Sequence, residues 1–208
     1  MDCMQDKLAV VLPSRGLLFS ETLEELLGEL KDFKYKIFWS HGRSLPECFN
    51  IPTEEALADP EVFAVLFCED DMIIPKGILK EMFAQNYPVV ALDYPFQQDG
   101  DATTLHDPEG MAYWTGTGFM LVARQVLENA PKPIWQTGRT FDPFVDQDTL
   151  HFWPRKLDKT YYGLHDLNFG LTLYSAGMPI KPMDKTAGQR KLRKLGSPAT
   201  NNGAHKID

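Results

Sequence analysis

The sequence predicts an α/β fold with a mixed, mostly parallel β-sheet flanked by helices. Short apolar runs of strand length alternate with amphipathic segments of helical period through the first half of the chain. One of these runs, from Phe63 to Cys68, ends abruptly in three consecutive acids. Buried strands of α/β sheets end in this way where the sheet edge meets a ligand, because repelling carboxylates are not tolerated in a dry core.

The first half of the chain supplies four strands and the helices between them. We expect strands from Lys7 to Pro13, Tyr35 to Ser40, Phe63 to Cys68 and Pro88 to Asp93. We expect helices from Glu21 to Lys31 and Lys76 to Gln85, and short helical pieces from Leu45 to Asn50 and Glu54 to Ala58. In the first helix the leucines recur at helical spacing, so Leu23, Leu26, Leu27 and Leu30 should face the sheet.

The second half is less regular. A strand from Thr117 to Ala123, a helix from Arg124 to Asn129 and a helix from Asp166 to Ala176 closed by Gly177 are predicted. The polar segment from Gln97 to Gly110 has no period, and we expect a mobile loop that orders on ligand binding. Residues 131–154, rich in proline and aromatic residues, give no element.

Length and charge limit the possibilities. The 208 residues suit one domain, residues 1–187, followed by a basic and partly flexible tail, residues 188–208. The net charge of −8 argues against a nucleic-acid coat protein, although the basic tail leaves room for a local contact with DNA. Three widely spaced cysteines without CxxC spacing, no signal-peptide pattern and no run of membrane-span length predict a cytoplasmic protein.

The acids Glu69, Asp70 and Asp71 are the first candidate site. Clustered carboxylates are hard oxygen ligands for Mg²⁺ or Mn²⁺, and these cations bridge proteins to phosphates. The alternative is a solvated acidic turn. A second candidate is Asp166, an acid at the start of a helix, where the helix dipole should keep it ionised at neutral pH as a base. The alternative for Asp166 is a helix N-cap.

Several segments in a fixed order resemble one family. They are PSRG after the first strand, LPECFN, FCEDDMIIP, WTGTGFMLVARQVLE and GLHDLNFGLTLYSAGMPI. Together they resemble a small GT-A-fold glycosyltransferase of the large family-two class, from about Lys7 to Gln189. The resemblance leans towards the compact, stand-alone enzymes of bacteriophages.

The resemblance implies roles for individual residues. Glu69 and Asp71 fall on the acidic positions of the DxD motif, where Asp71 would ligate a Mn²⁺ or Mg²⁺ ion and Glu69 would face the ribose or the metal, with Asp70 sharing either role. Asp166 falls on the catalytic base of inverting members. The implied donor-binding residues are Pro13, Ser14, Arg15, Asn50, Glu69, Asp70, Gly116, Thr117 and Gly118. Trp114 beside this glycine turn is either a stacking platform for the donor or a packing residue.

Two positions depart from the family pattern. His165 stands where most relatives have an acid, and we interpret it as a surface or packing residue. Gln189 stands where metal-dependent relatives have a histidine ligand; a neutral amide oxygen is a poorer ligand.

The implied activity is transfer of a sugar from a nucleotide-diphosphate donor, with a UDP-sugar favoured, to an acceptor hydroxyl on a glycan or on a modified base in phage DNA. A GT-A-like module that binds sugar or nucleotide without turnover, within a structural assembly, is the alternative. A nucleotidyltransferase is disfavoured because the glycine-rich, basic signature near the first strand is missing. The sequence leaves the oligomeric state open.

Overall fold

A computed structural model describes residues 6–14, 16, 18–94, 104–136 and 165–190. The elements run in chain order as β1 (Lys7–Ser14), α1 (Ser20–Leu30), β2 (Tyr35–His41), α2 (Glu47–Leu57), β3 (Val62–Cys68), β4 (Met72–Ile73), α3 (Ile78–Ala84), β5 (Val89–Asp93), β6 (Leu105–His106), β7 (Ala112–Trp114), β8 (Phe119–Ala123), α4 (Arg124–Asn129), α5 (His165–Ser175), β9 (Lys181–Thr186) and β10 (Gly188–Gln189). Within these ranges no helix combines the length and the apolar character needed to cross a membrane.

The main sheet is mixed and mostly parallel, as predicted. Its strand order is β2-β1-β3-β8-β5-β9. β1, β2 and β3 are parallel, as are β5 and β9, while β8 runs antiparallel to both of its neighbours. Because β8 is reversed, the chain enters β8 at the same edge of the sheet where it leaves β3. That edge therefore receives the acids after β3 and the glycine turn before β8.

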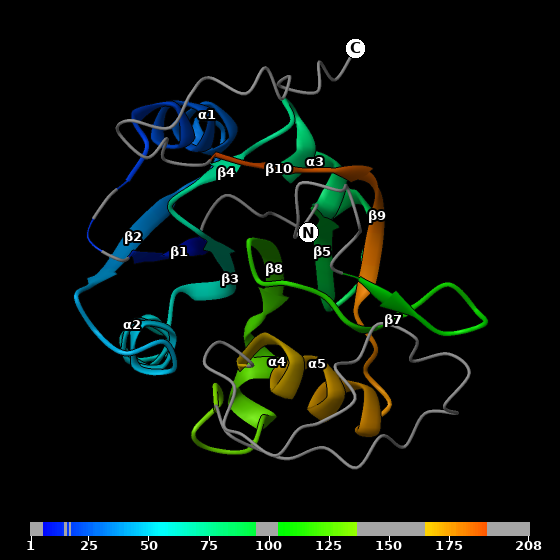
Figure 1. Cartoon of the computed structure of the whole chain (residues 1–208). Coiled ribbons are helices and arrows are strands. Elements are labelled where there is room, and N and C mark those ends of the chain that lie inside the picture. Colours follow the sequence, from blue (N-terminus) through cyan, green and yellow to red (C-terminus); the bar gives the residue numbers. More distant parts are fainter. Residues whose placement is uncertain (1–5, 15, 17, 95–103, 137–164, 191–208) are drawn as a thin grey trace, which may run out of the picture.

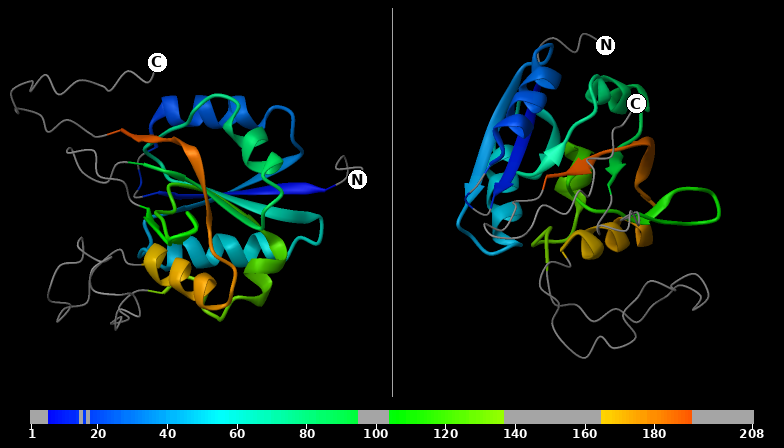
Figure 2. Two further views of the ribbon diagram at one scale, coloured as in Figure 1. Left: turned by 90° about the vertical axis from the view of Figure 1, so that its right-hand side faces the viewer. Right: turned by 45° about the horizontal axis from the view of Figure 1, so that its top comes forward.

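Helices cover both faces of the sheet. Figure 1 shows α1 and α3 on one side and α2, α4 and α5 on the other. The alternation of β1 explains the two cores, since Leu8, Val10 and Leu12 pack with α1 and α3 while Ala9 and Val11 pack on the opposite face. Figure 2 shows β9 and β10 as one continuous segment that passes from the edge of the sheet to the side of α1.

Most of the predicted elements are found, and four details differ. The two short helical pieces after β2 are one helix, α2, which continues through Pro52. Pro52 has no backbone N–H and so removes one hydrogen bond from the helix. In the same turn the Thr53 side chain adds one, because its Oγ1 donates to the Phe49 carbonyl oxygen at 2.6 Å. Leu27 was expected to face the sheet, but it is exposed, while Leu26 and Leu30 are buried.

The segment expected to be a mobile loop contains ordered structure at its end. β6 pairs with β7, and Asp107 organises the turn between them by accepting the backbone N–H groups of Glu109 and Met111. Residues 97–103, which this prediction also covers, lie outside the described residues. Residues 188–190 belong to the folded domain rather than to the tail, because β10 pairs with β4.

Candidate functional site

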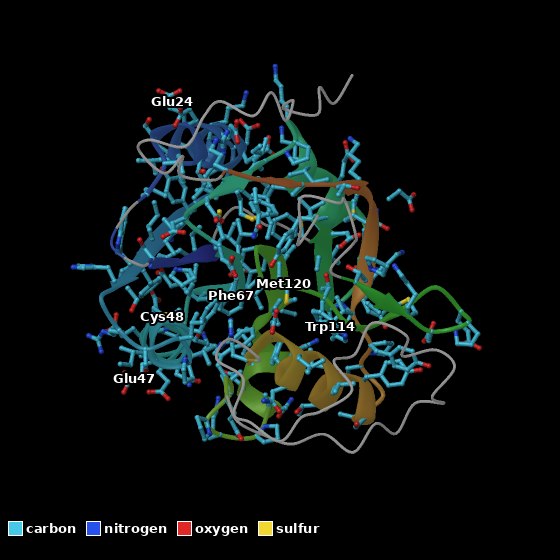
Figure 3. The ribbon with its side chains drawn as sticks, in the orientation of Figure 1. Glu24, Glu47, Cys48, Phe67, Trp114 and Met120 are labelled. Carbon is cyan, nitrogen blue, oxygen red and sulfur yellow. The ribbon has the colours of Figure 1, made fainter. Side chains whose placement is uncertain are left out.

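The site begins where β3 ends. The ladder between β3 and β8 continues one step past Cys68, because the Glu69 N–H donates to the Gly118 carbonyl oxygen at 2.9 Å. This bond fixes the first acid opposite the glycine turn of residues 116–118. Glu69 is two residues after Phe67, so the alternation of the strand puts both on the same face of the sheet. On this face Phe67 lies in the core formed with α2 and α5. Figure 3 labels Phe67 on β3 and Met120 on β8, which lie opposite each other two residues before Glu69 and two residues after Gly118.

Thr117 connects the acids to α5. Its hydroxyl donates to Glu69 Oε1 at 3.1 Å and lies 3.4 Å from His165 Nε2. A threonine has one hydroxyl proton, so once that proton is given to Glu69 the bond with His165 requires His165 Nε2–H as the donor. The buried His165 ring also packs against Phe49, with ring centroids 4.5 Å apart. Of the two interpretations of His165, packing residue or surface residue, the packing one agrees with the structure and the surface one is wrong; its Nε2 also contacts Thr117.

Asp166 is the next residue along α5. It lies inside the first turn of the helix, and its Oδ1 accepts the Leu167 N–H at 2.8 Å. Burial raises the pKa of the Asp166 carboxyl to about 7, against the backbone hydrogen bonds of Leu167 and Asp166, which lower it. We expected a carboxylate that is fully ionised at neutral pH. Desolvation outweighs the helix terminus, and the group instead titrates near neutrality.

The acids create a strongly negative environment. Burial raises the pKa of the Cys48 thiol to about 11, with the charges of Glu69 and Asp70 adding to the effect. Burial and the same acids, together with Asp71, raise the pKa of Cys68 well above its usual range. A site where carboxylate charge disfavours further anions is one where a divalent cation is favoured.

Tyr94 is a site residue that the sequence did not indicate. It follows β5, is buried, and its pKa is raised far above the usual value by burial and then by the charges of Glu69, Asp166 and Asp71. A Cβ atom on Gly116 would lie 2.0 Å from the Tyr94 hydroxyl oxygen, and one on Gly118 would lie 2.6 Å from the same ring. The two glycines thus let a phenol sit against the turn. The cue in the sequence was a tyrosine directly after a predicted strand.

Gln189 is brought to the acids by the pairing of β10 with β4, in which it lies opposite Met72. Pro13 and Ser14 end β1, beside β3, and Ser14 Oγ accepts the Gly16 N–H at 3.0 Å. Arg15 lies outside the described residues.

Two predicted donor-binding residues have other contacts. The Asn50 amide makes a paired contact with the Trp135 backbone, donating from Nδ2 to the carbonyl oxygen at 2.8 Å and accepting the N–H at 2.9 Å. Trp114 ends β7, where its backbone and Cβ pack on α5, within 3 Å of where a Cβ on Gly170 would be. The Asn50 side chain is therefore bonded to the Trp135 backbone, and both alternatives for the Trp114 ring, a stacking platform or a packing residue, stay open.

The acids suit a cation that is shared with a substrate. Among the described residues no three His, Cys, Asp or Glu side chains converge into a ready metal cage. Mg²⁺ and similar ions are commonly bound by one or two carboxylates together with substrate phosphates, and not by a cage of protein ligands alone. Carboxylates at an open sheet edge fit this arrangement.

No protein-family model and no curated protein sequence matches the chain. Among solved structures, the chain is similar to the catalytic domain of Drosophila β1,4-galactosyltransferase 7 in complex with xylobiose, at 15% identity and a TM-score of 0.48 over 88% of this chain and 67% of that one. It is also similar to A197 from STIV, at 20% identity and a TM-score of 0.48 over 63% and 71% of the two chains. A putative glucose-1-phosphate thymidylyltransferase from Bacillus anthracis matches at 8% identity and a TM-score of 0.47 over 88% and 89%. These likenesses concern the course of the backbone and carry no information about activity.

Proposed function

We propose that the chain is a GT-A-type glycosyltransferase that transfers a sugar from a nucleotide-diphosphate donor, with a UDP-sugar favoured, to an acceptor hydroxyl. The observation that carries the proposal is the meeting of two kinds of carboxylate at one sheet edge. Glu69 and Asp71 follow β3, and Asp166 opens α5. The Thr117 hydroxyl is hydrogen-bonded to Glu69 and to His165, the residue before Asp166, and the charges of Glu69, Asp166 and Asp71 all act on Tyr94.

The acids would hold the donor end of the reaction. Asp71 and Glu69 would bind Mn²⁺ or Mg²⁺, and Gln189 would contribute an amide oxygen, a poorer ligand than the histidine of metal-dependent relatives. When bound, such a cation neutralises the charge that develops on the diphosphate leaving group. Pro13, Ser14 and Arg15 at the end of the first strand would border the nucleotide, with Asp70 beside them. Gly116, Thr117 and Gly118 would line the sugar pocket together with Tyr94, whose ring packs against the two glycines.

Asp166 would act as the base. A base is most effective when its pKa lies close to the working pH, and the carboxyl of Asp166 has a pKa of about 7. It would accept the proton of the acceptor hydroxyl as the oxygen attacks the anomeric carbon from the face opposite the leaving diphosphate. One displacement of this kind inverts the anomeric centre. The acceptor class, a glycan or a modified base in phage DNA, is left to experiment.

A donor screen tests the proposal. Purified protein is incubated with a panel of UDP-, GDP-, CMP- and dTDP-sugars, with Mn²⁺, with Mg²⁺ or with EDTA, and released nucleotide is measured. We expect one donor to be consumed in a metal-dependent way, and we expect Asp71→Asn to abolish this consumption. Asp184→Asn, at an exposed position on β9, is the matched control and should behave as the wild type.

The acceptor is then sought with the active donor. Glycan arrays and DNA containing hydroxymethylated bases separate the two acceptor classes. If the protein binds a nucleotide sugar tightly but neither hydrolyses nor transfers it under any of these conditions, the alternative of a binding module without turnover is correct. Absence of both binding and turnover contradicts the proposal altogether.

A further inference from the structure

The backbone that carries Asp71 is held by a residue from the far end of the chain. The Arg190 N–H donates to the Asp71 carbonyl oxygen at 2.6 Å. Its side chain then turns towards α1, where Nη1 donates to the Met72 carbonyl oxygen and, at 2.9 Å, to Thr22 Oγ1. The sequence assigned Arg190 to the basic and partly flexible tail, but its side chain is only 15% exposed.

Helix α1 completes this contact. Thr22 Oγ1 donates to the Met72 carbonyl oxygen at 2.7 Å, so this carbonyl accepts from both Thr22 and Arg190. Arg190 Nη2 donates to Glu25 Oε1 at 2.5 Å, and the Ile74 N–H donates to Glu25 Oε2 at 2.8 Å. Thr22 and Glu25 are three residues apart, so both point to the same side of α1. We call Arg190, Thr22 and Glu25 the Arg190 clasp.

We infer that Arg190 is a positioning residue for the metal- and diphosphate-binding acids, acting through the Arg190 clasp. Backbone groups of Asp71, Met72 and Ile74 are bonded to Arg190 itself or to a side chain that Arg190 contacts. Asp71 lies in the short turn between β3 and β4, and the two-residue pairing of β4 with β10 is the only sheet contact beside it among the described residues. The clasp supplies a further constraint from a second layer of the molecule. This inference rests on the proposed function for the meaning of the acids, but not for the geometry of the clasp.

The chemistry of the clasp requires arginine. The planar guanidinium presents two nitrogens at a fixed angle, one for the Met72 carbonyl and Thr22 and the other for the Glu25 carboxylate. A lysine has a single ammonium and can satisfy one side or the other. Partner groups that orient a metal ligand typically contribute roughly 10–100-fold to metal affinity. The clasp should contribute by a similar factor.

The test uses two variants and a control. Arg190→Lys keeps the positive charge but loses the second nitrogen of the guanidinium. Thr22→Val keeps the shape of a fully buried side chain but removes its hydroxyl. Lys185→Gln is the control: it lies on β9 of the same C-terminal segment and forms an exposed ion pair with Glu81 at 2.5 Å. If Arg190→Lys does not fold, Thr22→Val decides the question.

The first readout is local hydrogen exchange in the full chain. We expect faster exchange in peptides covering residues 69–74 in both variants, with unchanged exchange in β5 and no change in the control. Uniformly faster exchange across the sheet, or wild-type exchange at residues 69–74, overturns the inference. This readout requires no activity and is independent of the proposed function.

The second readout is the affinity for Mn²⁺, titrated alone and with UDP. We expect roughly a 10–100-fold loss in both variants relative to wild type and control. If the wild type and Asp71→Asn bind Mn²⁺ equally weakly, the proposed function fails at its metal site while the exchange data still judge the clasp. If the wild type binds Mn²⁺ through Asp71 and the clasp variants match the control, the positioning role is wrong and the proposed function stands.

Discussion

His165 and Glu69 share the hydroxyl of Thr117, which donates to one and accepts from the other. The three residues come from α5, the end of β3 and the turn before β8. None of them is adjacent in sequence, and the reversed direction of β8 is what brings them to one edge. These hydrogen bonds join the candidate metal ligand Glu69 to His165, the residue that precedes the candidate base Asp166.

Removing this hydroxyl should affect activity more than stability. Thr117→Val keeps the side-chain volume and deletes both contacts. Thr53→Val is the matched control, because Thr53 is also fully buried and also donates one hydrogen bond, to the Phe49 carbonyl oxygen in α2. Each variant should lose about 1 kcal/mol in urea unfolding, the usual net value of a hydrogen bond. Only Thr117→Val should lower kcat/KM for the donor, and an equal loss in the control would contradict a role for Thr117.

The activity should depend on pH with a midpoint near 7. A general base must be deprotonated, and the pKa of Asp166 is raised to about 7 by burial. We therefore expect kcat/KM to rise from pH 5.5, pass its midpoint near pH 7 and level off above pH 8. Asp166→Asn should lower the rate on the plateau above pH 8 by about 10²–10⁴-fold and remove this midpoint, so the difference from the wild type narrows towards pH 5.5. A flat wild-type profile between pH 6 and pH 8 would assign the base elsewhere.

The same carboxyl should make the protein less stable as the pH rises from about 4 to 7. Its ordinary pKa is 3.8 and its folded value is about 7, so the folded state holds the proton more tightly. This contribution is fully present below pH 3.8 and is lost as the pH rises through 7. Since one pKa step corresponds to about 1.4 kcal/mol, the change is on the order of a few kcal/mol. Urea titration should show that the wild type loses unfolding free energy relative to Asp166→Asn as the pH rises from 4 to 8. A constant difference across this range would show that the carboxyl is solvated.

Gly116 and Gly28 should respond in opposite ways to alanine. A Cβ on Gly116 would meet the Tyr94 hydroxyl oxygen at 2.0 Å, so Gly116→Ala should displace the ring and cost about 1–3 kcal/mol. Nothing lies within 4 Å of a Cβ on Gly28, which is inside α1, so Gly28→Ala should stabilise the protein by about 0.5–1 kcal/mol. Thermal unfolding of the two variants checks both signs. Tolerance of alanine at Gly116 would mean that Tyr94 does not pack against the turn.

The fold was largely predictable because its strands are short apolar runs and its helices are amphipathic. The acids after β3 and Asp166 on α5 were visible for the same reason, since charged residues interrupted or followed these patterns. Arg190 was not predictable, because its partners Thr22 and Glu25 lie in an ordinary helix far away in sequence. For Tyr94 the sequence offered one cue, a tyrosine directly after a predicted strand, but its contact with the two glycines arises only when β5 and β8 pair. The pKa of Asp166 required the buried environment, which no local pattern encodes.

The candidate metal ligand Asp71 and the candidate base Asp166 are held by helices on opposite faces of the sheet. The segment with Asp71 is tied to α1 on one face of the sheet, whereas Asp166 rides on α5, which packs on the other face. A loosening of α5 would release the base and leave the grip on the leaving group intact. Under the proposed function, a variant loosened in this way would still split its donor slowly with water but would no longer activate the acceptor. Substitutions under α5 should therefore uncouple hydrolysis from transfer, and the acceptor preference of such an enzyme can drift without disturbing how it holds its nucleotide.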